Sequence, residues 1–406
     1  MKPRRFYEAV TATLLAVLIG AVLAAPAMAQ GNSGKNKDKD DGGTEEPVEL
    51  PPIEYQVQLF EFPADGSGSI FGANNLGQVV GFNFNRATNG YRAWLFDATL
   101  DPQQAVDLNS LPIKGVPDGY VIGAALDIND WGFAVGFLQL DGDETTESRR
   151  GYVLDTITWS MQTFPEEEEP AHSFALKINE DNLVLGGYDW FNEDGFRIHE
   201  GFYLYYPIEQ SFMFPDIEGI SNRSMDLNNS LEGRPAQVAG HERGSVSAPK
   251  NMLRLTLPDA LEVIDLHEDA TSTTFAAMND AGTMCGHISF DISTHPRKRE
   301  IVTYPFRYNQ SLELLPVPPS GGGGAFDINS AGDIVTSYHV YHDDWGYVSP
   351  DDVLIGSPET MERWFAGRGE IKLLGDRNAS DFGLLVGTLY ESDGSAGFVL
   401  VPVPVE

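Results

Sequence analysis

Short apolar stretches recur along the chain from about residue 55 to its end, and polar segments rich in glycine and proline separate them. Their spacing is typical of β-strands, and the helical period of about 3.6 residues is absent. The stretch ALDINDWGFAVGF, Ala125 to Phe137, shows the pattern clearly. We interpret it as strand, tight turn and strand, because Asn can bond its own backbone at a turn and Gly supplies a positive φ.

The same frame recurs through the chain, so this hairpin is one unit of a repeat. Matching copies are GANNLGQVVGF, LKINEDNLVLGG, AAMNDAGTMCGH and AFDINSAGDIVT, and two longer copies are MDLNNSLEGRPAQVAGH and LGDRNASDFGLLVGT. The framing asparagines are Asn74, Asn129, Asn179, Asn228, Asn279, Asn329 and Asn378. Their spacings of 55, 50, 49, 51, 50 and 49 residues indicate a tandem repeat.

We expect the turn positions of this frame to be structural. In the third copy Asn182 replaces the turn glycine, and Asn is the next-best residue for the left-handed region. That substitution favours turn chemistry over ligand chemistry. The expected structural turn residues are Asn74, Gly77, Asn129, Gly132, Asn179, Asn182, Asn228, Asn279, Gly282, Asn329, Gly332, Asn378 and Gly383.

Each copy continues with a third apolar stretch and, in most cases, a fourth. The third stretch is RAWLF in the first copy, RGYVL in the second and DDVLIG, from Asp351, in the sixth. Four short strands in about 50 residues is the size of a propeller blade. The sequence therefore predicts an all-β fold, a seven-bladed β-propeller with four antiparallel strands per blade. An unassigned strand, YQVQLFEF at residues 55–62, is expected to close the ring as the outer strand beside AGFVLVPV in the last blade.

The frame Ile-Asn-Asp-x-Gly followed by Val-Gly, and then a strand with a small residue and an aromatic, resembles the HAF-type extracellular repeat of bacterial secreted proteins. The resemblance covers residues from about 68 to 400. The His-Ala-Phe of that family stands here as Arg-Ala-Trp, Arg-Gly-Tyr and Glu-Gly-Phe. The resemblance implies an extracellular repeat protein and brings no defined activity with it.

The first residues are typical of a secretory signal peptide. Lys2, Arg4 and Arg5 precede an apolar run, and the small residues of AMA precede Gln30. We predict a signal peptide over 1–29 with cleavage near Ala29, a disordered acidic and polar linker over 30–52, and the propeller over 53–406. The mature protein is expected to be secreted, extracellular or periplasmic, without membrane insertion.

The net charge limits the classes of partner that the protein can bind, and the cysteine content limits the covalent links that it can form. The formal net charge of −34 would repel nucleic acid and anionic membrane surfaces. Cys285 is the only cysteine, so no intramolecular disulfide forms, and we interpret it as a core residue. We expect a monomer without cofactor or metal. Calcium at LDGDETTE, from Leu140, is an alternative, although this segment lacks the glycine and distal Glu of an EF-hand.

Catalytic motifs such as His-Glu-x-x-His and Gly-x-Ser-x-Gly are absent from the sequence. The connections between second and third strands look long and differ in every copy, and varied loops on a rigid scaffold usually carry binding residues. Two of them, YDWFNEDGFRIHE and SYHVYHDDWGYVSPDD, place aromatic residues beside carboxylates, which suits sugar rings or cationic groups. The candidate ligand-binding residues are Tyr188, Trp190, Asp194, Tyr341, His342, Asp343 and Trp345.

The sequence thus favours a secreted, non-catalytic binding module that presents one loop-rich propeller face to a glycan, peptide or protein. The alternative is a propeller-fold hydrolase or lyase that acts on an extracellular polysaccharide. Enzymatic propellers converge carboxylates or histidines on the central channel, and the strands expected to line this channel, such as GAAL and FAAM, look apolar and small.

Overall fold

In a computed structural model of the chain, the residues before Ile53 form a unit separate from Ile53–Glu406. The structure describes residues 53–61, 66–85, 90–97, 105–142, 148–164, 172–191, 197–215, 217, 220–231, 233–242, 251–294, 300–319, 324–336, 339–343, 346–348, 354–355, 385–390 and 395–404. The predicted signal peptide and linker lie outside these residues. Among the described residues, none forms a helix with the length and hydrophobicity needed to span a membrane.

The described chain is all-β, apart from a 3₁₀ turn, η1 (Leu108–Ser110). Six four-stranded antiparallel sheets follow one another along the sequence. The first three contain β2 (Gly66–Ala73), β3 (Gln78–Asn85), β4 (Gly90–Asp97), β5 (Val106–Asp107); β6 (Tyr120–Ile128), β7 (Phe133–Leu140), β8 (Arg150–Asp155), β9 (Ser160–Thr163); and β10 (His172–Ile178), β11 (Val184–Phe191), β12 (Arg197–Tyr206), β13 (Ser211–Met213). The next three contain β14 (Ile220–Leu227), β15 (Gln237–Glu242), β16 (Met252–Thr256), β17 (Ala260–Ile264); β18 (Ala270–Met278), β19 (Met284–Asp291), β20 (Ile301–Tyr308), β21 (Leu312–Leu314); and β22 (Ala325–Ile328), β23 (Ile334–Thr336), β24 (Val340–His342), β25 (Gly346–Val348).

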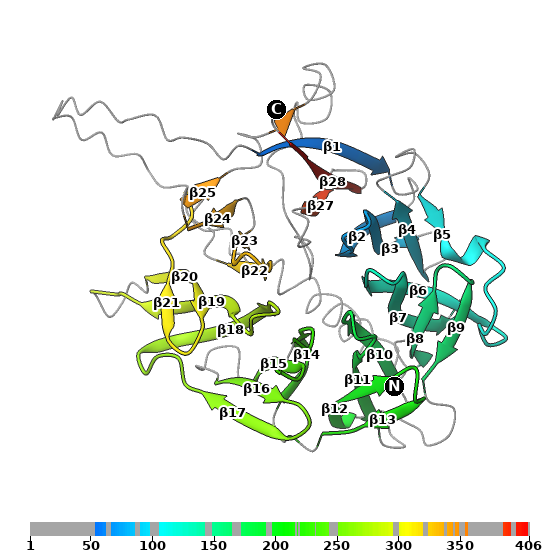
Figure 1. The fold of residues 1–406 in the computed structure, drawn as a ribbon, viewed down its shortest axis with the longest axis horizontal. Helices are drawn as coiled ribbons and strands as arrows, with labels where there is room; N and C mark the ends of the chain where they lie inside the picture. Colours follow the sequence, from blue (N-terminus) through cyan, green and yellow to red (C-terminus); the bar gives the residue numbers. More distant parts are fainter. Residues whose placement is uncertain are drawn as a thin grey trace, which may run out of the picture. The chain divides into compact units, whose positions relative to one another are not determined.

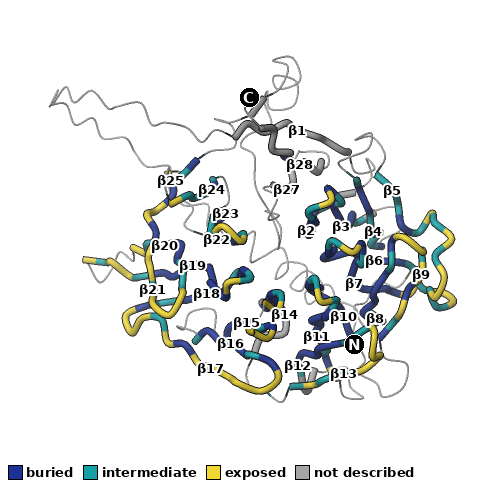
Figure 2. Tube along the Cα trace, viewed as in Figure 1, coloured by how far each residue is buried: buried dark blue, intermediate teal, exposed yellow. Residues whose placement is uncertain are grey.

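Within each of these sheets the strands are ordered as they occur in the chain, and the first strand lies nearest a common centre (Figure 1). First strands of successive sheets contact one another from β2 through β22. This is the arrangement of propeller blades. The outer strands β9, β17 and β21 are largely exposed, whereas the strands nearer the centre are buried (Figure 2).

The apolar core lies between neighbouring sheets rather than at the centre. One cluster joins Val80 and Leu95 of the first sheet to Ile122 and Tyr152 of the second. Clusters of the same kind join the second sheet to the third, the third to the fourth, the fourth to the fifth and the fifth to the sixth. Each of the second to fifth sheets is therefore stabilised by the apolar side chains of both its neighbours, as stacked repeats require.

A further four-stranded sheet joins the two ends of the described chain. Its order is β26 (Leu354–Ile355), β1 (Ile53–Glu61), β28 (Ser395–Pro404) and β27 (Leu385–Tyr390). The predicted pairing of the N-terminal strand with AGFVLVPV is confirmed, since β1 and β28 pair antiparallel over nine residues from Ile53 to Glu61. The expectation that β1 is outermost is wrong, because β26 adds beside it in parallel. β28 Val399 packs with Ile70 and Phe96 of the first sheet.

The interpretation of the sixth repeat also needs correction. DDVLIG was expected to supply its third strand, and SYHVYHDDWGYVSPDD was expected to be a long loop. Instead β23 pairs antiparallel with β24, the Thr336 amide donates to the His339 carbonyl at 2.8 Å, and β24 and β25 complete the sheet. Val340 and Tyr341 are strong strand formers within a polar stretch, which explains the strand. DDVLIG contributes β26 to the other sheet.

The second glycine of the frame has a packing role. A Cβ at Gly136 would lie 2.0 Å from the Ala124 carbonyl oxygen and 3.0 Å from the Tyr152 hydroxyl. The Tyr152 hydroxyl donates to that same carbonyl at 2.9 Å. Glycine on the second strand therefore makes room for the aromatic residue on the third, which accounts for their joint recurrence in the repeat.

Candidate binding site at the centre of the turn side

The Asn-x-x-Gly turns lie at one end of the sheets, which we call the turn side. Their last positions adopt the left-handed conformation, with φ of 84° at Gly77, 78° at Gly132, 61° at Asn182, 79° at Gly282 and 92° at Gly332. Asn378 and Gly383 lie outside the described residues. The positive φ explains why Gly or Asn recurs there.

Each of the six framing asparagines that the structure describes also caps its own turn. The Asn129 Oδ1 accepts the Phe133 amide at 3.0 Å, and the Asn179 Oδ1 accepts the Leu183 amide at 2.9 Å. Asn74, Asn228, Asn279 and Asn329 accept from their own turns in the same way. The side chains at 74, 129, 179, 228 and 279 are buried, so these bonds satisfy backbone groups that water does not reach.

The amide nitrogen of the same side chains links each sheet to the next. The Asn74 Nδ2 donates to the Asn129 carbonyl at 2.9 Å, and Asn129 donates in turn to the Asn179 carbonyl at 3.0 Å. The chain continues to Asn228, Asn279 and Asn329 at 2.9, 3.3 and 3.0 Å. Five bonds thus run in one direction round six sheets, and we call this series the asparagine ring.

Sequence reasoning expected only the turn role. A clue was present in the repeat itself: Ser or Asp can also open a turn, yet all seven copies carry Asn. The Asn amide offers an oxygen acceptor for its own turn and a separate NH₂ donor for the neighbouring sheet, whereas Asp has no donor and Ser must use one oxygen for both.

The turn glycines allow a matched test of backbone strain. Gly132 and Gly119 share a positive φ, of 78° and 80°, but a Cβ at Gly132 would lie 2.9 Å from Thr156 Oγ1, whereas nothing lies within 4 Å at Gly119. We expect Gly119→Ala to lower the unfolding free energy by about 1 kcal/mol and Gly132→Ala by about 2 kcal/mol. Urea denaturation measures both, and an equal loss would show that crowding at Thr156 is unimportant.

The residue after each framing asparagine forms a second series of bonds. The Asn75 amide and Nδ2 donate to the two Asp130 carboxylate oxygens at 2.7 and 2.8 Å. The Asp130 amide donates to Glu180, and the Glu180 amide donates to the Asn229 Oδ1 at 2.6 Å. Asn229 then donates to both oxygens of Asp280 at 2.9 and 2.8 Å. Carboxylate and amide side chains are thus fixed in position around the centre.

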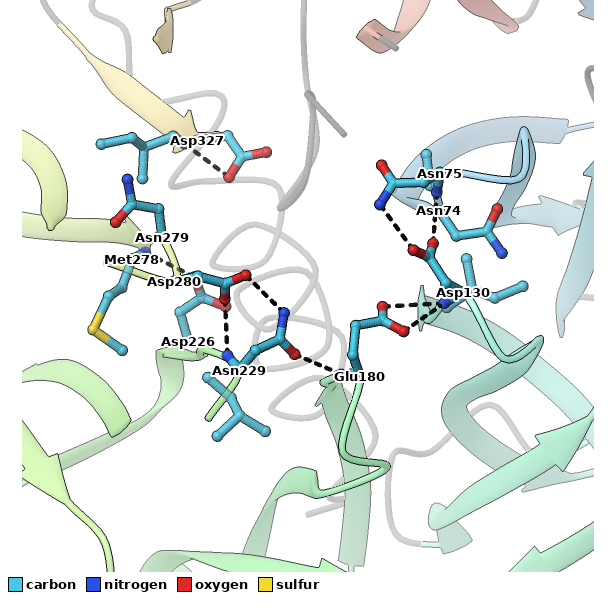
Figure 3. A pocket seen from close by; sticks show the side chains of 14 residues that line it. Asn74, Asn75, Asp130, Glu180, Asp226, Asn229, Met278, Asn279, Asp280 and Asp327 are labelled. Atoms are coloured by element: carbon cyan, nitrogen blue, oxygen red, sulfur yellow. Dashed lines mark hydrogen bonds between the residues drawn. The ribbon is translucent and has the colours of Figure 1, made fainter. Parts of the chain in front are cut away.

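These two series surround a hollow of about 620 Å³, part of which is open solvent (Figure 3). Its walls carry carboxylates and amides and no cationic side chain among the described residues. The polar lining consists of Asn74, Asn75, Asp130, Glu180, Asp226, Asn229, Asn279, Asp280 and Asp327. The expectation of an apolar centre is therefore wrong at this end of the channel, because polar turn residues form the mouth.

An exposed indole stands beside the hollow. Trp131 is 59% exposed, follows the lining residue Asp130, and donates its Nε1 hydrogen to the Glu180 carbonyl at 2.9 Å. The bond holds the ring in place while its face stays accessible. Sequence reasoning missed Trp131 as a binding candidate because it treated the turns as scaffold alone.

The candidate residues of the third repeat lie at the opposite end of their sheet. β11 begins just after its turn and runs away from the turn side to Phe191. Tyr188 packs over Gly201 of the neighbouring strand and against Phe214, with ring centroids 5.8 Å apart. Trp190 is 37% exposed. Asp194 lies outside the described residues.

The candidate residues of the sixth repeat lie at the turn side instead. The His342 Nδ1 is 2.8 Å from the Asp333 Oδ1, and Asp343 forms an ion pair with Arg307 at 3.0 Å. Tyr341 packs against Tyr347, with centroids 5.1 Å apart. Trp345 lies outside the described residues. The expectation of one shared loop face is wrong, since the hairpin of β24 and β25 replaces the long loop.

Electrostatics explain the His342 contact. Burial raises the pKa of Asp333, but the hydrogen bond and charge of His342 outweigh it, so the pKa of Asp333 lies below its usual value. The pair ties β24 to the turn of its own sheet.

Among the described residues no group of three or more His, Cys, Asp or Glu side chains is placed to hold a metal ion. Of the proposed calcium segment, Asp141 pairs with Arg92 at 3.2 Å, and Asp143 lies outside the described residues.

A buried histidine predicts a pH dependence of stability. Burial lowers the pKa of His287 from 6.5 to about 4. Below pH 6.5 the unfolded chain binds a proton that the folded chain excludes, so stability falls as the pH falls from 6.5 to 4, by about 3 kcal/mol in all. We expect His287→Gln to flatten this part of the unfolding curve in chemical denaturation. Parallel curves for the two proteins would contradict the assignment.

Repeated four-stranded sheets, joined by hydrogen bonds around a polar centre, define a protein of the propeller type. The chain belongs to the family described as "Protein of unknown function (DUF3466)", whose model matches residues 24–314. No curated protein matches the chain significantly in sequence.

Solved structures of similar fold have low identity. The β-propeller domain of the Trilobed protease from Pyrococcus furiosus is 13% identical over 80% of this chain and 92% of that chain, with a TM-score of 0.44. Oligogalacturonate lyase in complex with manganese is 9% identical over 86% and 96%, with a TM-score of 0.45. The six-bladed fungal lectin from Aleuria aurantia is 10% identical over 71% and 95%, with a TM-score of 0.39.

Proposed function

We propose that this protein is a secreted, non-catalytic binding module, and that its ligand enters the hollow on the turn side. The ligand is a glycan, peptide or protein segment rich in hydrogen-bond donors. One observation carries the proposal: carboxylate and amide acceptors from successive sheets converge on one hollow, with the exposed indole of Trp131 beside it. Such sites combine an apolar ring face with a few placed polar groups.

The acceptor side chains around the hollow are held in fixed positions, which favours binding. Each acceptor of the second series is held by a neighbour's backbone or amide, as Asp130 is by Asn75. A ligand therefore meets groups that are already ordered and loses less conformational entropy on binding. The same convergence of carboxylates is what the hydrolase or lyase alternative requires, and that alternative predicts cleavage of a polysaccharide that binds in the hollow.

Two tryptophans at opposite ends of the sheets give a matched test. A carbohydrate and peptide array on the purified mature protein identifies a ligand, and its affinity is then measured for Trp131→Ala and Trp190→Ala. We expect Trp131→Ala to weaken binding about tenfold or more, because stacking on an exposed indole is lost, and Trp190→Ala to leave it unchanged. The reverse result would place the site on the opposite face.

We also propose that the ring has seven blades and that β1 closes it. The seven four-stranded sheets and the pairing of β1 with β28 support this architecture. Secretion rests on the signal-peptide pattern of the N-terminus, and kinship with HAF-type repeats rests on the repeated frame.

A further inference from the structure

The turn of the fourth repeat is longer than the other turns that the structure describes, and it carries an arginine. The Asn228 Oδ1 accepts the amide of Gln237, nine residues further on, whereas the matching bond of Asn129 spans four residues. Within the longer turn, Leu231 and Arg234 exchange backbone hydrogen bonds of 2.9 and 2.7 Å. Insertions into single copies of a repeat often form the binding face, so we looked for a pocket beside this one.

The inserted arginine reaches the next sheet. The Arg234 Nη1 donates to the carbonyl of Ala281, in the turn of the fifth repeat, at 3.1 Å. Among the described residues this is the only hydrogen bond of the exposed Arg234 side chain. A guanidinium has several N–H donors in a planar fork. The bond to Ala281 therefore holds the group between two sheets and leaves its other donors available to a ligand.

A pocket of about 800 Å³, part of which is open solvent, lies beside this arginine, between residues of the fourth and fifth sheets. We call it the side pocket. Arg234 and Arg254 line it, together with the exposed amide residues Asn309 and Gln310. Asp280 is the one carboxylate among its described lining residues, and that carboxylate already accepts two hydrogen bonds from its neighbour in the fourth sheet. The side pocket thus offers cationic and amide donors, whereas the hollow offers acceptors.

The two arginines of the side pocket differ in how their charge is compensated. The Arg254 Nε and Nη2 donate to the Glu262 Oε2 at 2.9 and 2.5 Å. Its counterpart in the fifth sheet, Arg307, pairs in the same way with Glu313 at 2.8 Å. Arg234 has a backbone carbonyl as its partner and forms no ion pair with a described residue. Its charge is therefore available to an anionic group of a ligand.

The side pocket adjoins the hollow, because Asn229 and Asp280 line both. We propose that the side pocket binds the carboxylate of a uronate ring, with Arg234 as its ion-pair partner, while hydroxyls of the same glycan donate to the acceptors of the hollow. Arginine suits this role because its planar fork matches a carboxylate with two parallel hydrogen bonds. The inference rests on the proposed function and narrows its ligand to a glycan that carries a uronate.

A uronate suits the two neighbouring pockets better than an acidic peptide does. A sugar ring carries hydroxyl donors next to its carboxylate, whereas the side chain of Asp or Glu brings no donor to the hollow. The exposed indole of Trp131 also suits a sugar ring. The net charge of −34 repels polyanions, which favours a single uronate over a polyuronate chain. Salt screens this distant charge beyond about 8 Å, so the adjacent guanidinium dominates for a single carboxylate.

Calorimetric titration of the mature protein with two matched sugars tests the carboxylate site. D-glucuronate and D-glucuronamide share their ring and hydroxyls and differ in the charge of one group. We expect glucuronate to bind about tenfold more tightly, because its pair with a guanidinium is charge-assisted on both sides. Equal affinities, or no binding of glucuronate, would overturn the proposal.

Two arginine variants locate the effect. Arg234→Gln should lower the affinity for glucuronate to that for glucuronamide and leave the affinity for glucuronamide unchanged. The matched control is Arg92→Gln, at an arginine near the start of β4 that pairs with Asp141, and it should keep the wild-type preference. Arg234 is exposed, so its replacement should leave the melting temperature unchanged. A preference for glucuronate that survives in Arg234→Gln refutes the site.

N-acetylglutamate amide serves as the peptide counterpart of the sugar probes. We expect it to bind more weakly than glucuronate, because it lacks the ring hydroxyls. If it binds as tightly and loses affinity in Arg234→Gln, the side pocket takes acidic peptides and the assignment to a uronate is wrong. The two failures are distinguishable: loss of the carboxylate site shows in Arg234→Gln, whereas the two tryptophan variants judge the hollow separately.

Discussion

Removal of β1, residues 53–61, is expected to lower the melting temperature by about 10 °C or more, because it takes an entire strand out of the sheet that joins the chain ends. β1 pairs with β28 along nine residues and with β26 on its other side, so its loss exposes two strand edges at once. Val399 of β28 packs on the first sheet, which transmits the loss to the neighbouring core.

Deletion of residues 32–49 is the control for this experiment. The sequence predicts no strand there, so the melting temperature should stay that of the protein without the deletion. Differential scanning calorimetry measures both deletions. If the β1 deletion variant has the same melting temperature as the wild type, the pairing of the chain ends contributes nothing to stability.

Asn179→Ala is expected to lower the unfolding free energy by about 4 kcal/mol, since a buried side chain with three hydrogen bonds is lost. Its Oδ1 accepts the amides of Asp181 and Leu183 at 3.1 and 2.9 Å, and its Nδ2 donates to Asn228 at 2.9 Å. Two backbone amides and the link between the third and fourth sheets lose their partner together. Urea denaturation measures the change.

Two further variants separate the turn role from the link. Asn179→Asp keeps the acceptor for the turn but sets an oxygen against the Asn228 carbonyl, so it should destabilise by about 2 kcal/mol or more if the link matters. Asn309→Ala, at an exposed asparagine, should change stability by less than about 0.5 kcal/mol. Wild-type stability in Asn179→Asp would show that the asparagine ring does not stabilise the contacts between sheets.

The sequence predicted the sheets well because their signals are local. Regular asparagine spacing, turn glycines and apolar strands identify a repeat without any knowledge of its contacts with other repeats. The hairpin at Asn129 could therefore be predicted from its own residues. The sixth repeat was misread because Val340 and Tyr341 stand among histidines and aspartates, and a three-residue strand gives no periodicity.

The site was harder to foresee because it depends on contacts between repeats. Nothing local tells that the amide of Asn74 reaches Asn129, or that Glu180 accepts from Asp130. The polar hollow arises only when turns from successive sheets meet.

The most direct measurement of the central claim is amide hydrogen exchange with and without the ligand that the array identifies. We predict slower exchange in the ligand-bound protein at the turns, residues 73–78, 128–133, 178–183 and 278–283, and unchanged exchange at the far end of β11, residues 188–191. Protection confined to the far end of β11, with the turns unaffected, would contradict binding in the central hollow.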